Sequence, residues 1–293
     1  MRAARLPVAS SCGLLLLGLL SVSSALGGTV YNFESCNLGA IGVWSGGPPP
    51  GCDAWYTPTV SGTDAAVVRP YTDLQGLGLA VDPTGGNYLL TLATTVDAAT
   101  RAQHDFNYSA SAIWSVSYDL DVVNATNTGA DTSYGTAYIG SFAVMRTSTS
   151  GSAFTAVDAW DSSATDSTWS ILYFAYDASN HALNSGNGVA AWTGLPQDHW
   201  YRESTVFDDK TNQILLVSLT DLTTGVTSSF SPSGWYMSGG AAGTFNWNAF
   251  RVAGFGSTNA LAVDNFDLDA VPEPATLLLT GLGLIGLIVF RRR

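Results

Sequence analysis

The sequence predicts an all-β protein: a single antiparallel β-sandwich that stands between two apolar, membrane-directed ends. Alternation of polar and apolar residues recurs along the chain, as half-buried strands require. Outside the two ends, no long window has helical periodicity. Residues 28–270 are numerous enough for one core, and no composition shift divides them, so we expect one domain.

The N-terminus has the order of features of a secretory signal peptide. Arg2 and Arg5 precede an apolar run, and small residues around Ala25 provide a cleavage site. We therefore expect residues 1–27 to be removed during export. The rest of the chain would then fold outside the cytoplasm.

Several stretches of the central region are typical of strands. In 113–123 the apolar residues share one face, whereas serines and aspartates share the other, which we expect to face solvent. Residues 201–230 predict a meander of three strands joined by two turns rich in Asp, Thr, Asn and Gly. Turns at this spacing favour a sandwich. Residues 213–221 are the middle strand of this meander, and further strands are predicted at 87–95, 169–177 and 250–256.

The charge of the mature domain excludes one class of partner. Removal of both ends leaves 6 Lys and Arg against 22 Asp and Glu, a formal net charge of −16. Nucleic acid binding depends on cationic side chains that neutralise phosphates, so this domain is not expected to bind nucleic acid. An acidic surface suits neutral glycans, divalent cations or simple solubility.

Cys36 and Cys52 are the only cysteines in the mature domain. In an oxidising compartment such a pair predicts a disulfide. The bond would close a short loop rich in Gly and Pro, and we expect that loop to present Trp44 and Trp55.

The C-terminal segment predicts a membrane anchor. Residues 275–290 carry no charge and would span about 24 Å as a helix. Arg291, Arg292 and Arg293 follow, and positive charge keeps its flank cytoplasmic. We therefore predict one transmembrane helix at 275–290, with residues 28–270 on the outer side of the membrane.

The triplet Pro272-Glu273-Pro274, the apolar span and the terminal arginines resemble the PEP-CTERM sorting signal of exported proteins in Gram-negative bacteria. This resemblance implies that 271–293 form a sorting signal. It implies recognition and cleavage by an exosortase, a membrane-embedded transpeptidase, after transient anchoring in the inner membrane. The product would then reach the cell surface or the extracellular medium. An ordinary anchor with an incidental proline pair is the alternative.

The terminal strands resemble those of concanavalin A-like and carbohydrate-binding-module jelly rolls. The likeness is carried by 31–35, by 262–271 and by the hairpin within 198–221. It implies that the first and last strands pair. It also implies that Glu34 and Asp264 meet and hold a structural calcium ion; the alternative is that both are ordinary polar positions on strands.

Glycan binding and hydrolysis make different demands on the residues. Sugar rings stack on flat aromatic side chains, and Trp44, Trp192 and Trp235 lie in segments rich in Gly, Ser or Pro that favour exposure. A glycosidase needs two carboxyl groups about one bond, but Glu203 stands alone. The three histidines belong to no catalytic motif. We therefore predict no catalytic residues.

Together these features predict an exported, exosortase-sorted surface protein with a non-catalytic, glycan-associated or adhesive domain. Exopolysaccharide or another glycan is the expected ligand. The alternatives are a divergent carbohydrate-active enzyme and a purely structural component of the envelope or biofilm.

Overall fold

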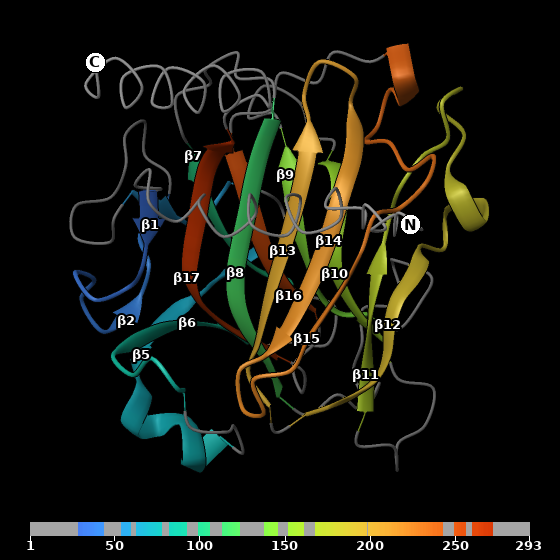
Figure 1. Ribbon diagram of the computed structural model, residues 1–293. Coiled ribbons are helices and arrows are strands. Elements are labelled where there is room, and N and C mark those ends of the chain that lie inside the picture. The colour runs from blue at the N-terminus through green and yellow to red at the C-terminus, as the bar shows by residue number, and fades with distance from the viewer. Residues whose placement is uncertain are drawn as a thin grey trace, which may run out of the picture.

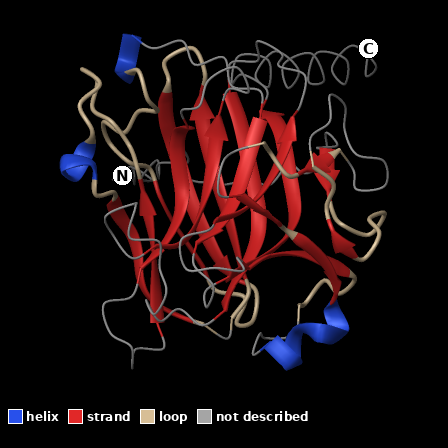
Figure 2. Ribbon diagram, turned by 180° about the vertical axis from the view of Figure 1, so that it is seen from behind, coloured by secondary structure: helices blue, strands red, loops and turns tan. Residues whose placement is uncertain are grey.

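The computed structural model shows an all-β protein whose strands fill the centre of the molecule, with short helical turns at the periphery (Figure 2). Among the predicted features, Trp44, Cys52 and the whole C-terminal sorting segment lie outside the described residues. The structure describes residues 29–43, 54–59, 63–77, 82–92, 99–105, 113–123, 138–145, 152–160, 168–197, 199–242, 249–255 and 260–271.

Within the described residues the larger sheet has nine strands, eight of them in one row (Figure 1). The ninth, β1 (Thr29–Tyr31), pairs with β17. The row runs β15 (Thr227–Phe230), β14 (Gln213–Asp221), β13 (Tyr201–Asp208), β8 (Ile113–Val123), β17 (Ala260–Val271), β6 (Asn87–Leu92), β5 (Val67–Pro70) and β2 (Gly39–Ala40).

A six-stranded sheet and a two-stranded sheet complete the described strands. The six-stranded sheet comprises β10 (Ser152–Trp160), β9 (Tyr138–Met145), β16 (Ala249–Phe255), β7 (Ala99–Asp105), β3 (Trp55–Tyr56) and β4 (Thr63–Ala65). The two-stranded sheet pairs β11 (Thr168–Tyr173) with β12 (Val189–Pro196). The 3₁₀ turns are η2 (Tyr71–Leu77), η4 (Leu183–Gly186) and η5 (Gly240–Ala242).

The two larger sheets pack face to face through aromatic side chains. Phe266 of β17 stacks on Phe250 of β16, with ring centroids 5.3 Å apart. Tyr118 of β8 lies 4.3 Å from Phe142 of β9. Both contacts join a strand of the nine-stranded sheet to a strand of the six-stranded sheet. Within the sheets, the strands named above pair antiparallel, except that β4 pairs parallel to β7. This arrangement agrees with the predicted sandwich.

Strand β8 shows why the pattern of the sequence predicts the fold. Its apolar residues alternate into the core, and its bounds match the predicted 113–123. The opposite face is different from our expectation, because Asp119 and Asp121 are fully buried rather than exposed to solvent. Asp121 lies opposite Ala262, which belongs to a small apolar cluster on the outer face of the sheet that also includes Leu74 of η2.

The first and last strands of the described chain pair with each other. Thr29 lies opposite Leu268 and Tyr31 lies opposite Phe266. The first strand ends earlier than the predicted 31–35, because residues 33–36 form a turn that the Cys36 amide closes on the Phe33 carbonyl at 3.1 Å. This turn sends the chain away from β17.

No helix within the described part of the chain is both long and apolar enough for a membrane span. The predicted signal peptide and the predicted anchor at 275–290 fall outside those residues.

Candidate functional site

Three half-buried aromatic side chains meet at the edge of the sandwich, and we call Trp192, Phe230 and Trp235 the aromatic edge group. The ring centroids of Trp192 and Phe230 are 5.7 Å apart, and those of Phe230 and Trp235 are 5.8 Å apart. Each residue comes from a different part of the chain: β12, the end of β15 and the segment after β15. The structure thus brings together two of the three tryptophans predicted to bind sugars.

Backbone contacts in the two-stranded and the nine-stranded sheets position this group. Trp192 lies opposite Ile171 of β11, and Phe230 lies opposite Val217 of β14. The carbonyl of Trp235 accepts a hydrogen bond of 3.0 Å from the amide of Ile214. All three side chains pack against the main core; Trp192 and Phe230 belong to paired strands, whereas Trp235 lies in the segment after β15.

Beneath the group lies the fully buried carboxyl of Glu203 on β13. The Tyr173 ring is 5.7 Å from that of Trp235, and its hydroxyl donates to Glu203 Oε1. The Tyr118 hydroxyl donates to Glu203 Oε2 at 2.7 Å. Burial raises the pKa of Glu203 to about 8, although the two tyrosine hydrogen bonds act to lower it.

Glu203 thereby ties the two layers together. Tyr118 belongs to β8 beside it, whereas Tyr173 belongs to β11, whose sheet supports Trp192. The Tyr173 hydroxyl also lies 3.0 Å from the Thr205 hydroxyl. The sequence offered no pairing signal for this lone glutamate, because its partners are 30 and 85 residues away.

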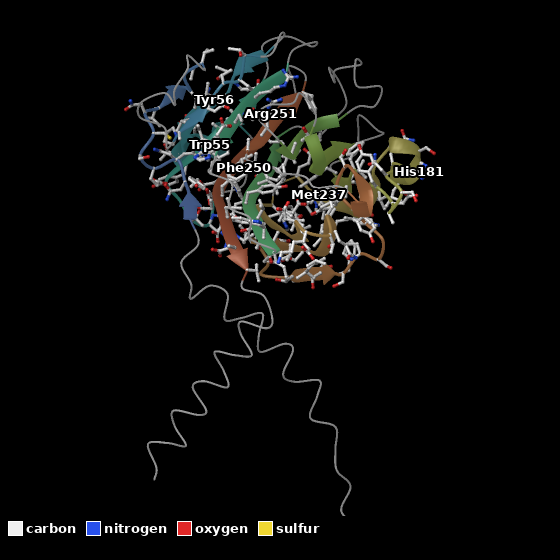
Figure 3. All side chains as sticks on the ribbon, turned by 90° about the horizontal axis from the view of Figure 1, so that it is seen from above. Trp55, Tyr56, His181, Met237, Phe250 and Arg251 are labelled. Carbon is white, nitrogen blue, oxygen red and sulfur yellow. The ribbon has the colours of Figure 1, made fainter. Side chains whose placement is uncertain are left out.

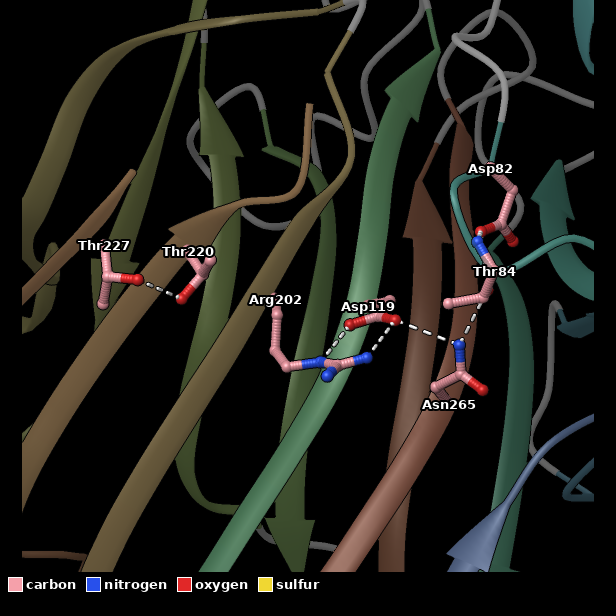
Figure 4. Close-up of polar contacts among 7 residues, drawn as sticks. All are labelled: Asp82, Thr84, Asp119, Arg202, Thr220, Thr227 and Asn265. Atoms are coloured by element: carbon pink, nitrogen blue, oxygen red, sulfur yellow. Dashed lines mark hydrogen bonds and ion pairs between the residues drawn. The ribbon is translucent and has the colours of Figure 1, made fainter. Parts of the chain in front are cut away.

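A second polar centre lies on the outer face of the large sheet (Figure 4). Arg202 donates from Nε and Nη2 to the two carboxylate oxygens of Asp119, both at 2.7 Å. The Asn265 amide donates to Asp119 Oδ2 and to Thr84 Oγ1, each at 3.0 Å. Thr84 in turn donates its amide and hydroxyl hydrogens to Asp82 Oδ1, at 2.8 and 2.6 Å. This network explains the unexpected burial of Asp119.

A β-bulge in β17 shapes that centre. Asp264 pairs with Asp119 and Asp267 pairs with Ser117, so β17 has one extra residue between the two pairs. Asn265 lies at the bulge in the left-handed region, with φ of 49°. Asparagine tolerates this conformation, and here its amide reaches across to Asp119.

Asp264 is a buried carboxyl in a negative field. It is 1% exposed, and its Oδ1 has no hydrogen-bond partner in the part of the chain that the structure describes. The same holds for Oδ2 of Asp82, which is 4% exposed. Burial, followed by repulsion from Asp82, Asp119 and Glu34, raises the pKa of Asp264 to about 8.

Glu34 approaches this centre from the turn after β1. Its Oε1 accepts the Asn87 amide at 2.8 Å. A Cβ at Gly86 would lie 1.6 Å from Oε1, and the φ of 88° also favours glycine there. The charge of Glu34 contributes to the raised pKa of Asp264, and the shared calcium site of the two carboxyl groups stays a prediction.

The donor set only partly resembles a calcium site. Calcium takes six to eight oxygen ligands, among them carboxylates and backbone carbonyls. Across the described ranges, no three His, Cys, Asp or Glu side chains form a group that could hold a metal ion. Glu34 and Asp264 would have to be joined by carbonyl oxygens or water, so calcium remains a prediction.

The outer face of the six-stranded sheet holds a third polar cluster. Gln103 donates to the Tyr56 hydroxyl at 2.6 Å and accepts from Arg251 Nη2 at 2.6 Å. The Tyr56 hydroxyl donates to Asp105 at 2.8 Å. Figure 3 shows Tyr56 and Arg251 near each other. These side chains donate to and accept from one another, and we assign the cluster no ligand.

The remaining predicted site residues lie mostly outside the described part of the chain. These are Trp44, Cys52 and the sorting and membrane-orienting residues of the C-terminus. Cys36 is disulfide-bonded, but the expectation that its loop presents Trp55 is wrong, because Trp55 is fully buried in the core against Phe250 and Phe266. His199 and His181, which the sequence assigned to no motif, each face an aspartate, with Nδ1 at 2.7 Å from Asp221 and 3.1 Å from Asp177.

The C-terminal residues match a known family model. It is described as the PEP-CTERM protein-sorting motif, and the match covers 270–293. The chain carries a PEP-CTERM sorting motif. Such a motif marks an exported protein that an exosortase sorts to the cell envelope or surface. No curated protein matches the sequence.

Solved structures similar to this chain include lectins and lectin-like proteins. Lectin II from Ulex europaeus is 13% identical, with a TM-score of 0.43, and the likeness covers 82% of this chain and 97% of that one. Arcelin-5 of Phaseolus vulgaris, a lectin-like defense protein, is 10% identical, with a TM-score of 0.39 and the same coverage. The globular domain of T. cruzi calreticulin is 10% identical, with a TM-score of 0.42, covering 86% and 92%. Because each TM-score is below 0.5, these likenesses carry no functional argument.

Proposed function

We propose that this exported protein binds a neutral glycan through the aromatic edge group, without catalysis. The observation that carries the proposal is the meeting of Trp192 and Trp235 through Phe230. Aromatic faces offer the flat apolar surfaces on which sugar rings stack. Packing against the core holds the rings in place, so little ordering would be needed on binding.

The acidic surface supports the choice of a neutral ligand. With a formal net charge of −16 over residues 28–270, the domain repels polyanionic chains. A neutral exopolysaccharide at the cell surface is the ligand class that we propose. The protein would meet this polysaccharide at the cell surface, to which the sorting motif directs it.

The buried carboxyl supports binding rather than hydrolysis. Glu203 lies behind Trp235 through Tyr173, and tyrosine hydroxyls donate to both of its oxygens. It is 0% exposed, so it does not reach a sugar seated on the rings. Release of reducing ends from a bound polysaccharide would contradict this part of the proposal and favour an enzyme.

A glycan array with single variants tests the binding site. We expect Trp192→Ala and Trp235→Ala each to weaken binding about tenfold, equivalent to about 1.4 kcal/mol. Tyr71→Ala is the matched control, because Tyr71 is 47% exposed on η2, at the opposite side of the molecule from β12 (Figure 1). Equal binding by all three variants would reject the aromatic edge group.

The sorting step has a separate test. We propose that the predicted helix at 275–290 anchors the precursor in the inner membrane and that an exosortase removes it. Replacement of Pro272-Glu273-Pro274 by three alanines is expected to leave an uncleaved, membrane-bound precursor. Normal processing of that variant, seen by immunoblotting of membrane and medium fractions, would contradict the assignment.

A further inference from the structure

Strand β17 remains paired to its last residue. Ala270 lies opposite Trp114, and Val271 lies opposite Ile113. The next residue, Pro272, opens the sorting triplet, and the matched motif begins at residue 270, inside the strand. No spacer therefore separates the folded sheet from the sorting motif.

The first described strand begins at the same end of the sandwich. β1 runs antiparallel to β17, with Thr29 opposite Leu268. The predicted signal peptide ends at residue 27, two residues before β1. Both membrane-directed segments thus attach to adjacent strands at one end of the fold.

We call this end the exit face and define it by Thr29, Ile113, Val271 and the turn Asp208–Gln213. Asp208 lies opposite Ile113, so the turn is two strands from Val271. Neighbouring strands are about 4.8 Å apart, which places the turn about 10 Å from the point of exit. Figure 1 shows β8 between β13 and β17.

The reach of the chain limits how far this face can lie from the membrane. The predicted anchor begins at residue 275, four residues after Val271, and four residues extend at most about 14 Å. Crossing the headgroup layer takes about 5–8 Å of that length. We propose that the exit face lies against the membrane surface while the protein is anchored, and that cleavage of the sorting motif uncovers it.

Electrostatic attraction does not hold the exit face to the membrane surface. The turn carries Asp208 and Asp209 against Lys210, the one lysine of the chain. A net negative turn is repelled by an anionic lipid surface. The contact is therefore held by the short connection alone, and the released domain is expected to leave the membrane. This inference rests on the proposed anchoring and is independent of glycan binding.

Two exposed threonines at opposite ends of β14 provide matched probes. Thr211 lies in the turn of the exit face, and Thr223 lies in the turn between β14 and β15. The nine residues of β14 separate these turns by about 30 Å. We would prepare Thr211→Cys and Thr223→Cys in the exported chain from residue 28 onward, with the unsubstituted chain as background.

The measurement is labelling by a membrane-impermeant maleimide-PEG on liposomes of phosphatidylethanolamine and phosphatidylglycerol, which contain no exosortase. We expect Thr211→Cys to react at least about tenfold more slowly than Thr223→Cys on liposomes, and equally fast in detergent. A flexible insertion of 12 Gly and Ser residues after Val271, spanning roughly 20 Å, is expected to restore labelling at position 211.

Equal rates at both positions on liposomes would overturn the proposal, as would slow labelling that the insertion does not relieve. Failure of the chain to float with the liposomes would also overturn it, because the anchor itself would then be absent. None of these results bears on the glycan array, so the two proposals fail separately.

Discussion

Glu203 and Asp264 are both buried carboxyl groups whose pKa is raised to about 8, but their surroundings differ. Glu203 lies between the layers, where two tyrosine hydroxyls donate to its oxygens. Asp264 lies on the outer face, where Asp82, Asp119 and Glu34 add repulsion and Oδ1 lacks a described hydrogen-bond partner.

The contrast separates two uses of a buried carboxyl. Both oxygens of Glu203 accept hydrogen bonds from tyrosines of the fold, and burial favours the neutral form of its carboxyl group. The Asp264 site is incomplete, since within the described residues its Oδ1 has no hydrogen-bond partner and the guanidinium of Arg202 is paired with Asp119. We infer that Glu203 joins the layers beneath the aromatic edge group, whereas Asp264 is stabilised by a bound proton or, in its place, a metal ion.

The largest expected effect is the loss of the Glu203 carboxyl. Glu203→Ala would leave the buried Tyr118 hydroxyl without its acceptor and open a cavity between the layers. We expect a loss of about 3 kcal/mol in the free energy of unfolding, measured by urea denaturation at pH 6. Glu203→Gln keeps the volume and is expected to cost less than about 1.5 kcal/mol. A Glu203→Ala protein as stable as the wild type would contradict this role of the carboxyl.

The pH dependence of stability follows from the raised pKa values. Because the folded-state pKa of Glu203 is about 8 rather than 4.5, the native protein keeps a proton that the unfolded chain has released. Its contribution is complete below about pH 4.5 and disappears as the pH rises through 8. At about 1.4 kcal/mol per pKa unit, we expect Glu203 alone to make the wild type lose about 3 kcal/mol between pH 5 and pH 8.

Variants assign that loss to its sources. Asp264 contributes in the same direction, since its folded-state pKa is also raised. Thermal melts of Glu203→Gln and Asp264→Asn should each show a shallower decline with pH than the wild type. A wild type that gains stability over this range would contradict both assignments.

Removal of the guanidinium beside Asp119 is expected to have an intermediate effect. Arg202→Ala leaves a carboxylate whose side chain is 1% exposed without its bidentate partner. Because the guanidinium itself is 43% exposed, we expect a loss of about 2 kcal/mol rather than the larger cost of a deeply buried pair. Arg202→Lys keeps the charge and should recover part of the loss in the same denaturation assay.

Calcium is expected to have the smallest effect. If Glu34 and Asp264 hold the ion, calcium at ten times its dissociation constant stabilises the protein by about 1.4 kcal/mol. Differential scanning fluorimetry should then show a higher Tm in calcium than in chelator, and Asp264→Asn should lose the difference. The absence of any calcium shift in the wild type would reject the site.

The strand bounds and the pairing of the terminal strands could be predicted from the sequence, whereas the buried polar contacts could not. Strands β8 and β14 have the predicted bounds, because their alternation is long and unbroken. The pairing of the terminal strands was also predicted. Burial of Asp119 was not, because it depends on Arg202 and Asn265 from distant strands and on a bulge that breaks the alternation of β17.

The aromatic edge group likewise depends on contacts between residues that are distant in the sequence. Local composition marked Trp192 and Trp235 as candidates, but it gave no sign that Phe230 would join them. Glu203 was set aside as solitary because its tyrosine partners are far away in the sequence. Tertiary contacts of this kind leave no local pattern.

The most direct test of the account is affinity electrophoresis in gels that contain the producer's own exopolysaccharide. We compare the wild type with Trp192→Phe, Trp192→Ala and the control Tyr71→Ala. If sugars stack on the aromatic edge group, the polysaccharide retards the wild type and Tyr71→Ala most, Trp192→Phe less and Trp192→Ala least. Equal retardation of Trp192→Ala and the wild type would contradict the central claim.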